Sequence, residues 1–539
     1  MLAACASQPP TAQTPPEPAA TAAPAAEQPA ASEPAPAPAA GGTVTIGLDS
    51  EPPTMDPHAS PSAITFFITA SVGESLLYLD ENRELKPWLA ETWEVQDDGA
   101  SFVFTLREDV TFQDGTPFNA EAVKWNFDRI VDPNFAAGSA LTALAGYTGT
   151  EVVDAFTAKV SFENPYAPFL TYAAAGTLAM LSPTGTEAQG DAVNATPIMS
   201  GPYQISEYLP RESITITRWD GYTRTNPWSE SAGPGNPDQV IWKFIPEAGT
   251  RIATVESGET QIASAIPAQD LPRLQGENFE IVTKPWVGLP RIWSINVTVP
   301  PTDDLRVRQA ISYAINKDQI ITGLYNGTGT KAIGPATAAM LDDPSLREFY
   351  PYDPERARAL LEEAGWTGGD GEIRTKDGQP LTIVLNTIDP GSGPGQLEQF
   401  IQGQLREVGI DVQLKTQARA PWYEDNYACA TNGPVLFLRS GDLDGLAAFY
   451  DSELVGSNFN FSCIQDPEMD VLLQQGRVEA DPERRRAIYL ELSQKVMEQA
   501  LAVPLVDELS VWALRPGYSG LKFNGFTYPI VTDISGIDS

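Results

Sequence analysis

Short stretches of alternating apolar and polar residues predict β-strands in this chain. The first begins after Gly41-Gly42, where Thr43-Val-Thr-Ile-Gly-Leu48 has the period of a strand. Strand-like segments recur at 102–106, 214–216 and 240–245, and segments with helical spacing lie between some of them. The pattern therefore predicts a mixed α/β protein.

The region after residue 290 shows this alternation of elements most clearly. We predict a strand at 382–385, a helix over 396–408 that Gly409 ends, and a second strand at 410–414. The helix has an apolar stripe formed by Leu397, Phe400, Ile401, Leu405 and Val408. This order predicts a β-α-β unit with two parallel strands and a helix packed on one face.

Capping residues mark further helices. Asp353 precedes Pro354, and Asp481 precedes Pro482, so each aspartate is expected to cap a helix that has proline at its first position. Apolar spacing over 307–315 predicts another helix. No internal repeat is visible.

Composition narrows the classes of function. The 539 residues carry a formal net charge of −37, which repels phosphate backbones and anionic headgroups and argues against nucleic-acid binding. Apolar runs stay shorter than the roughly 18 residues that a transmembrane helix needs. We interpret the acidity as solubility outside the cytoplasm.

The N-terminal region resembles a lipid-anchored leash. Leu2-Ala3-Ala4-Cys5 fits a bacterial lipoprotein cleavage box, in which Cys5 is acylated. Residues 6–40 consist of Ala, Pro, Glu, Gln, Ser and Thr, which cannot form a core. The charged and apolar parts of a signal peptide are missing before Cys5, so we expect the sequence to begin inside a longer precursor.

The other two cysteines are Cys429 and Cys463. An exported protein permits a disulfide between them, which we predict. The alternative is two buried free thiols.

Motifs for catalysis or metal binding are lacking. His58 is the single histidine, and no nucleophile elbow, P-loop or Cys-x-x-Cys pair is present. Asp442-Leu-Asp444-Gly445 has the start of a calcium loop, but Leu446 occupies a position that needs an oxygen ligand. We expect neither an enzyme nor a bound cofactor or metal.

Aromatic residues suggest a ligand cleft. Several of the 11 tryptophans, and two phenylalanines of the segment 457–462, stand in polar or Pro/Gly-rich contexts. They are Trp228, Trp286, Trp293, Trp422 (next to Tyr423), Phe459 and Phe461. Together they suit a deep cleft that excludes water from a ligand, whereas the ordinary alternative for each is a place in the core.

A series of short elements between residues 85 and 129 resembles the family 5 extracellular solute-binding proteins, which include dipeptide, oligopeptide and nickel binders. The matching elements are Leu85-Lys-Pro-Trp-Leu-Ala-Glu-Thr-Trp-Glu-Val95, Asp98-Gly99, Phe102-Val-Phe-Thr-Leu-Arg107, Val110-Thr-Phe-Gln-Asp-Gly-Thr-Pro117 and Asn119-Ala-Glu-Ala-Val123. Later landmarks are Ser200-Gly-Pro-Tyr203, Asp304-Leu-Arg-Val-Arg-Gln-Ala310, Glu363-Ala-Gly-Trp366 and Val503-Pro-Leu505. The resemblance extends over nearly everything from Thr43 onward.

The resemblance implies a two-lobed periplasmic-binding-protein fold of type II, cluster C, with a small domain inserted in the first lobe. After the leash (1–42), lobe one would comprise 43–76, 197–291 and 507–539, the insert 77–196, and lobe two 292–506. Crossovers near Arg291 and Val506 would serve as hinges. Ligand binding between the lobes would favour the closed form.

The implied function is the capture of a small solute, best a di- or oligopeptide, for delivery to the permease subunits of an ABC importer. The protein would be a monomer in the periplasm or on the outer face of the cell membrane, held there through its lipid anchor.

The resemblance also suggests site residues. Asp442 matches an aspartate that binds the peptide ammonium, with a turn cap or a pair with Arg439 as the structural alternative. The family's arginine for the ligand carboxylate is missing from the loop 389–395, so Arg439 or Arg291 would have to replace it. The remaining candidate ligand contacts are Trp422, Tyr423, Trp293, Asn460, Phe461 and Glu51. Gln113, where the family usually has histidine, lies in the insert, and we expect no functional cost.

Four alternatives stay open. An oligosaccharide would stack on the tryptophans and need no cationic clamp, and a metal chelate is another ligand within the same family. An exported hydrolase would have to use a pair of carboxylates, as glycosidases do. An adhesive surface protein would show repeats.

Overall fold

The computed structural model describes residues 41–229, 232–368, 372–388 and 395–536. Cys5 and the proposed leash fall outside these ranges. In the part of the chain that the structure describes, no helix is both long and apolar enough to cross a bilayer.

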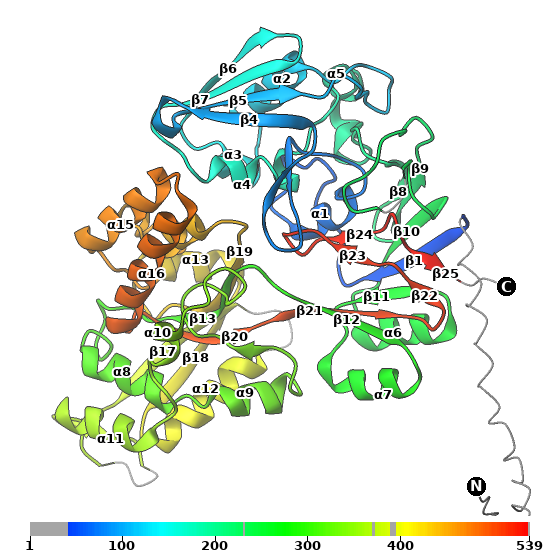
Figure 1. The fold of residues 1–539 in the computed structure, drawn as a ribbon. Coiled ribbons are helices and arrows are strands. Elements are labelled where there is room, and N and C mark those ends of the chain that lie inside the picture. Colours follow the sequence, from blue (N-terminus) through cyan, green and yellow to red (C-terminus); the bar gives the residue numbers. More distant parts are fainter. Residues whose placement is uncertain (1–40, 230–231, 369–371, 389–394, 537–539) are drawn as a thin grey trace, which may run out of the picture. The chain divides into compact units, whose positions relative to one another are not determined.

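Lobe one is built on a seven-stranded sheet with the order β12-β21-β11-β1-β10-β9-β8 (Figure 1). Its strands are β1 (Thr43–Leu48), β8 (Tyr203–Leu209), β9 (Ser213–Arg218), β10 (Gln239–Phe244), β11 (Ile262–Ser264), β12 (Glu280–Pro285) and β21 (Leu509–Leu514). Its helices are α1 (Ala63–Thr69), α6 (Ala248–Ser257) and α7 (Leu271–Gly276). The C-terminal pairs are β22 (Tyr518–Ser519) with β25 (Ser535–Gly536), and β23 (Lys522–Phe523) with β24 (Pro529–Ile530).

The insert contains a four-stranded antiparallel sheet, ordered β4-β5-β7-β6, at the top of Figure 1. These strands are β4 (Ala90–Gln96), β5 (Ser101–Leu106), β6 (Tyr147–Asp154) and β7 (Thr157–Phe162), preceded by the hairpin of β2 (Leu77–Leu79) and β3 (Leu85–Pro87). Its helices are α2 (Ala120–Val131), α3 (Ala140–Ala143), α4 (Phe169–Tyr172) and α5 (Pro183–Gln189). The insert packs around an aromatic core rich in phenylalanine, to which Phe526 of the C-terminal segment also contributes.

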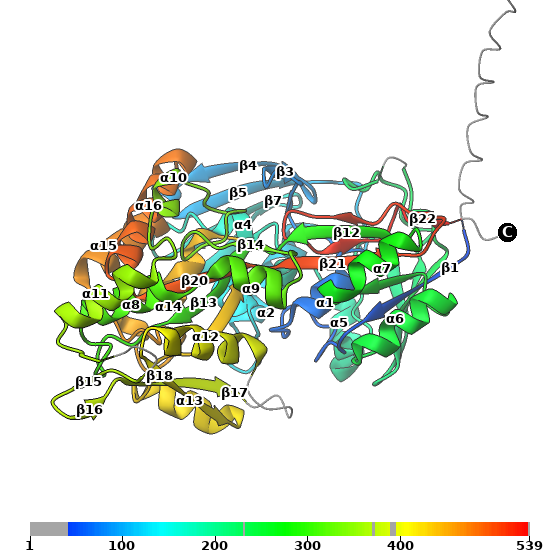
Figure 2. The ribbon, with the colours of Figure 1, turned by 90° about the horizontal axis from the view of Figure 1, so that it is seen from below.

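Lobe two holds a four-stranded sheet, ordered β14-β20-β13-β19, and a separate parallel pair, β17-β18 (Figure 2). The strands are β13 (Gly288–Ser294), β14 (Thr330–Lys331), β15 (Thr375–Lys376), β16 (Gln379–Pro380), β17 (Thr382–Ile388), β18 (Asp411–Gln417), β19 (Val435–Arg439) and β20 (Ala502–Asp507). The helices are α8 (Leu305–Ala314), α9 (Lys317–Leu324), α10 (Pro344–Arg347), α11 (Pro354–Glu363), α12 (Gln396–Glu407), α13 (Arg419–Tyr427), α14 (Ala447–Tyr450), α15 (Pro467–Val478) and α16 (Pro482–Glu498).

The predicted β-α-β unit is confirmed. Strands β17 and β18 run parallel with Thr382 opposite Asp411, and α12 connects them. The predicted caps are also present, because the Asp353 carboxylate accepts from the backbone N–H of Arg356 and the Asp481 carboxylate from that of Arg484.

The chain passes between the two main sheets twice. It leaves β12 of lobe one and enters β13 of lobe two through Trp286 and Val287. It returns from β20 to β21 through Glu508, along the red strands in the middle of Figure 1. These positions lie close to the predicted crossovers near Arg291 and Val506, which themselves fall in strands of lobe two. The residue limits of the lobes stay a prediction.

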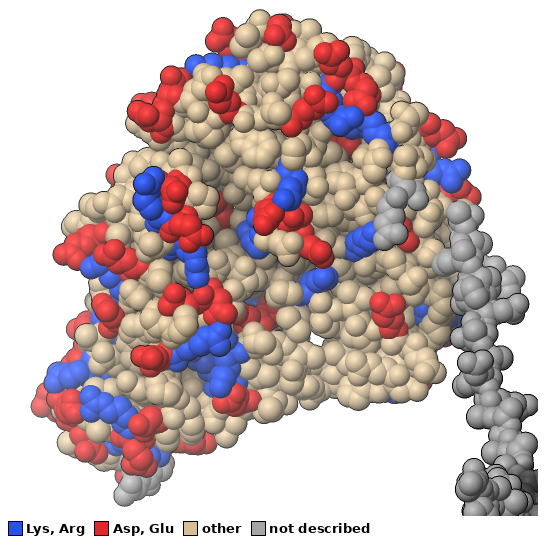
Figure 3. Space-filling view, viewed as in Figure 1, with Lys and Arg blue, Asp and Glu red and all other residues tan. Residues whose placement is uncertain are grey.

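On the face that Figure 3 shows, many basic side chains lie beside acidic ones. Arg107–Asp109 and Lys124–Asp128 are examples of partly exposed ion pairs. Each exposed pair contributes only about 0–1 kcal/mol, so these pairs add little to stability.

A buried ion pair joins the insert to lobe one. Arg129 of α2 donates to both carboxylate oxygens of Asp56, at 2.5 and 3.3 Å, and contacts His58 Nδ1 at 2.9 Å. His58 Nε2 lies 3.0 Å from the carbonyl oxygen of Ala179, and the imidazole is fully buried. Burial lowers the pKa of His58 from 6.5 to about 4.

In the structure Cys429 and Cys463 form a disulfide across 34 residues. Cys429 follows α13, whose Trp422 packs edge-on against Phe461, two residues before Cys463. The bridge therefore ties α13 to the segment that precedes α15.

The disulfide should stabilise the protein chiefly by lowering the conformational entropy of the unfolded chain. Replacing both cysteines by serine should lower the free energy of unfolding by about 3–4 kcal/mol in the chain-entropy model for a loop of this length. Urea unfolding of the two proteins, each without residues 1–40, measures the difference. Two reactive thiols in the denatured, unreduced protein would contradict the bridge.

His58 should make stability depend on pH. The unfolded imidazole binds a proton below pH 6.5 and the folded one only below about 4, so this contribution is complete above pH 6.5 and is lost between the two values. Relative to pH 8, the loss at pH 5 is about 2 kcal/mol. Urea unfolding of wild type and His58→Gln at both pH values isolates the contribution of His58, because all other groups titrate in both proteins. If the free energy of unfolding changed with pH equally in the two proteins, this contribution of His58 would be refuted.

Candidate ligand-binding site

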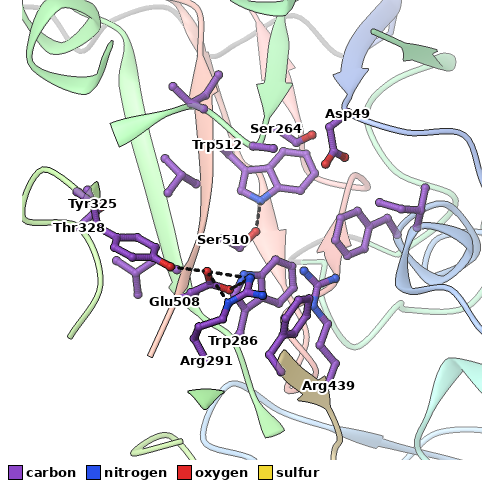
Figure 4. Close-up of a pocket in the computed structure, with 17 residues that line it drawn as sticks. Asp49, Ser264, Trp286, Arg291, Tyr325, Thr328, Arg439, Glu508, Ser510 and Trp512 are labelled. Carbon is purple, nitrogen blue, oxygen red and sulfur yellow. Dashed lines mark hydrogen bonds and ion pairs between the residues drawn. The ribbon is translucent and has the colours of Figure 1, made fainter. Parts of the chain in front are cut away.

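A cavity of about 380 Å³ lies where the lobes meet (Figure 4). Lobe one contributes residues that follow β1 and β11, the side of α1, and β21. Lobe two contributes β13, β19 and residues after α9, and the crossover residues Trp286 and Glu508 complete the wall. The cavity is thus lined by both lobes and by the chain segments that connect them.

The lobe-one wall is formed at the carboxyl ends of parallel strands. β11 runs parallel to β1, and Asp49 and Ala265 follow directly after these strands. Open α/β sheets bind ligands at this edge. Arg251 holds the edge in place, because its buried guanidinium donates to the carbonyl oxygens of Ile245, Ser264 and Ala265 at 2.6, 2.8 and 2.7 Å.

An ion pair links the two crossovers. Arg291 of β13 donates to both carboxylate oxygens of Glu508, with N–O distances of 2.9 to 3.2 Å. The hydroxyl of Tyr325 donates to the same carboxylate at 2.9 Å, and burial raises the pKa of that phenol. Glu508 is therefore neutralised within the wall of the cavity.

Arg439, the last residue of β19, carries a positive charge without an anionic partner. Its guanidinium lies 3.3 Å from the centroid of the Trp286 ring, and that ring stacks on Phe67 of α1. Nε of Arg439 is buried and unbonded, and the guanidinium makes no hydrogen bond or ion pair with any described residue. Burial lowers the pKa of Arg439, since the charged form has lost water. A cation in this setting favours an anionic ligand group.

Two of the nine predicted ligand contacts line the cavity, namely Arg291 and Arg439. The others have different positions. Trp293 is fully buried, with its indole N–H bonded to the Gly433 carbonyl, and Glu51 accepts from the Tyr208 hydroxyl and from a backbone amide. Four more, Trp422, Tyr423, Asn460 and Phe461, lie in lobe two near the disulfide and are absent from the described cavity lining, and the ninth, Asp442, is described next.

Asp442 is held by a protein cation. Arg485 of α16 binds its two oxygens at 2.5 and 2.8 Å, and one oxygen also accepts from the Asp444 backbone N–H. Burial raises the pKa of Asp442 and the Arg485 charge lowers it, with a net downward direction. The cap that we named as a structural alternative is present, with Arg485 rather than Arg439 as the ionic partner. Asp442 is not part of the described cavity lining, so we assign the ligand role to other residues.

Several lining residues were missed by sequence reasoning. Asp49, Tyr325 and Glu508 carry no motif, although Asp49 does follow a predicted strand. Trp286 stood out as an aromatic residue, but its pairing with Arg439 joins positions far apart in the chain. The loop 389–395, where the family resemblance leads one to expect an arginine for the ligand carboxylate, lies outside the described residues at positions 389–394.

Comparison with known proteins supports a binding role. The sequence-family model named bacterial extracellular solute-binding proteins, family 5, matches residues 84–442 of this chain. The glutathione-binding protein GsiB of Shigella flexneri is 29% identical over 500 residues, which cover 90% of this chain and 93% of that protein.

Among the described residues, no cluster of three or more histidine, cysteine or acidic side chains could hold a metal ion.

Solved structures share the fold. NikA from Brucella suis, in complex with Fe(III)-EDTA, has a TM-score of 0.80 and 26% identity, covering 92% of this chain and 99% of that chain. DppA from Helicobacter pylori, in complex with the peptide STSA, has a TM-score of 0.73 and 21% identity, covering 92% and 98%. The expected two-lobed binding-protein fold is thereby confirmed.

The matched family consists of transport binding proteins rather than enzymes, which agrees with our expectation. With a family match over residues 84–442 and a related fold over 92% of its length, the chain belongs to the bacterial extracellular solute-binding proteins of family 5, the binding components of ABC importers.

Proposed function

We propose that this protein captures a small peptide in the cavity between its lobes and delivers it to an ABC permease. The observation that carries this proposal is Arg439, a guanidinium stacked on Trp286 and lacking any anionic partner among the described residues. A peptide carboxylate would complete its hydrogen bonding with a charge-assisted contact. The names of GsiB and of the DppA complex agree with a peptide-like ligand.

The size of the cavity favours a short ligand. A volume of about 380 Å³ lies at the lower end of the usual range for small-molecule pockets, roughly 300–1,000 Å³. Phe437 is 40% exposed and lies against the Arg291 guanidinium at 4.3 Å, so it offers an apolar surface to a ligand side chain.

A carboxylate-rich metal chelate is the second candidate. NikA, at 26% identity, was crystallised with Fe(III)-EDTA, and an anionic chelate would also suit Arg439. Such a ligand would bring its own donor atoms to the metal and would need only charge and shape from the cavity.

We also propose that Cys5 anchors the protein to the outer face of a membrane, as a monomer whose leash, residues 6–40, gives the binding body reach. Residues 6–40 consist of alanine, proline and polar residues, a composition typical of tethers between a membrane anchor and a folded body.

Acylation of Cys5 should decide where the protein is found. Expressed behind a lipoprotein signal sequence, the wild type should sediment with membranes and incorporate labelled palmitate, whereas Cys5→Ser should be released in soluble form. Equal release of both proteins would rule out the anchor.

Removing the charge of Arg439 should weaken peptide binding. Arg439→Gln should lower the affinity for glutathione or trialanine by about 30-fold or more, because a buried carboxylate would lose its partner. Arg439→Lys should retain part of the affinity, since it keeps the charge without the planar fork. Calorimetry measures both, with Arg419→Gln, an exposed arginine outside the cavity, as the matched control.

The same titrations test the ligand class. Binding of maltotriose without binding of either peptide would replace the peptide by a sugar. Binding of Fe(III)-EDTA alone would favour the chelate. Peptide affinity unchanged in Arg439→Gln would place the anion elsewhere.

A further inference from the structure

The charges that line the cavity cancel only in part. Of the described lining residues four are charged, namely Asp49, Arg291, Arg439 and Glu508. Arg291 and Glu508 neutralise each other through two guanidinium nitrogens. The remaining charges are one anion, Asp49, and one cation, Arg439.

These two charges belong to opposite lobes. Asp49 directly follows β1 of lobe one, and Arg439 ends β19 of lobe two. Figure 4 shows Asp49 near Ser264 at one end of the cavity, and the guanidinium of Arg439 near Trp286 toward the other. The negative charge of Asp49 is among those that oppose the effect of burial on the pKa of Arg439, so the two groups share one electrostatic environment.

Neither charge has an ion-pair partner among the described residues, although the Asp49 charge also opposes the effect of burial on the pKa of Arg251, whose guanidinium donates to backbone carbonyl oxygens. Asp49 is exposed, and its one hydrogen bond to a described residue is from the Ser50 hydroxyl, at 3.5 Å, near the limit for such a bond. The Arg439 guanidinium lies over the Trp286 and Phe437 rings, 3.3 and 5.6 Å from their centroids, and it forms no hydrogen bond or ion pair with a described residue. A ligand with separated positive and negative ends would compensate both.

We propose that Asp49 receives the ammonium group of the peptide while Arg439 receives its carboxylate. The inference rests on the proposed function and adds a direction to it, with the amino end of the ligand on lobe one and the carboxylate on lobe two. Other acidic groups are already occupied, because Arg485 holds Asp442 and Arg291 holds Glu508.

This arrangement makes the ligand an electrostatic bridge between the lobes. A ligand with both charges contacts both lobes and favours the closed form, whereas a ligand with one charge leaves either Asp49 or Arg439 desolvated without a partner. Free peptides should therefore be selected over their N-acetylated and C-amidated derivatives.

The test pairs charge removal in the protein with charge removal in the ligand. The probes are glutathione and trialanine, each also in N-acetylated form, and the proteins are wild type, Asp49→Asn, and Glu280→Gln as control. Glu280 is an exposed carboxylate of β12, so its loss changes the net charge equally at a site outside the cavity. Calorimetry gives the affinities, and thermal melting confirms that each variant is folded.

We expect Asp49→Asn to weaken the free peptide that binds by roughly 30-fold or more and its N-acetylated form by less than about threefold, with Glu280→Gln unchanged for both. Equal loss for free and acetylated peptides, or no loss, would overturn the role of Asp49 while peptide binding by wild type still supports the proposed function. Wild type that binds neither free peptide would overturn the proposed function itself, and this inference with it.

Discussion

The ion pair between Arg291 and Glu508 is the contact on which the site depends. Arg291 lies in the first strand after one crossover and Glu508 lies in the other, so the pair joins the two segments that connect the lobes. Glu508 also acts on the charge of Arg439, but its hydrogen bonds go to Arg291 and Tyr325. Without this pairing, the two guanidinium groups and the two carboxylates that line the cavity could neutralise one another in other combinations, and no charge would be reserved for a ligand.

A reserved charge costs stability. The guanidinium of Arg439 gives up water beside Trp286 without gaining an anion, and the aromatic ring compensates only partly, by about 0.5–2 kcal/mol for a cation–π contact. In the proposed function, a ligand that supplies the anion removes this penalty. The unpaired charge would then contribute to affinity, and a ligand held by both lobes would favour the closed form.

The Asp442 region shows the opposite use of charge. Asp442 with Arg485, and Asp444 with Arg477, form pairs within lobe two, and the backbone N–H of Ala167 in the insert donates to the carbonyl oxygen of Arg477. These charges are satisfied by the protein itself, and the backbone hydrogen bond from Ala167 joins the insert to lobe two. Family resemblance alone cannot separate this structural role from a ligand role, because both require an acidic residue at the same position.

Local signals in the sequence determined much of the fold. These signals depend only on neighbours within a few residues, and each feature is present as predicted. They are the alternating apolar and polar residues of 43–48, the apolar stripe of the 396–408 helix, and the helix caps at Asp353 and Asp481. The cavity was decided by tertiary structure, since Asp49, Trp286, Arg439 and Glu508 come from four separate segments. Whether an aspartate faces a ligand or an arginine depends on which residues distant in the chain pack against it, and no local pattern encodes that choice.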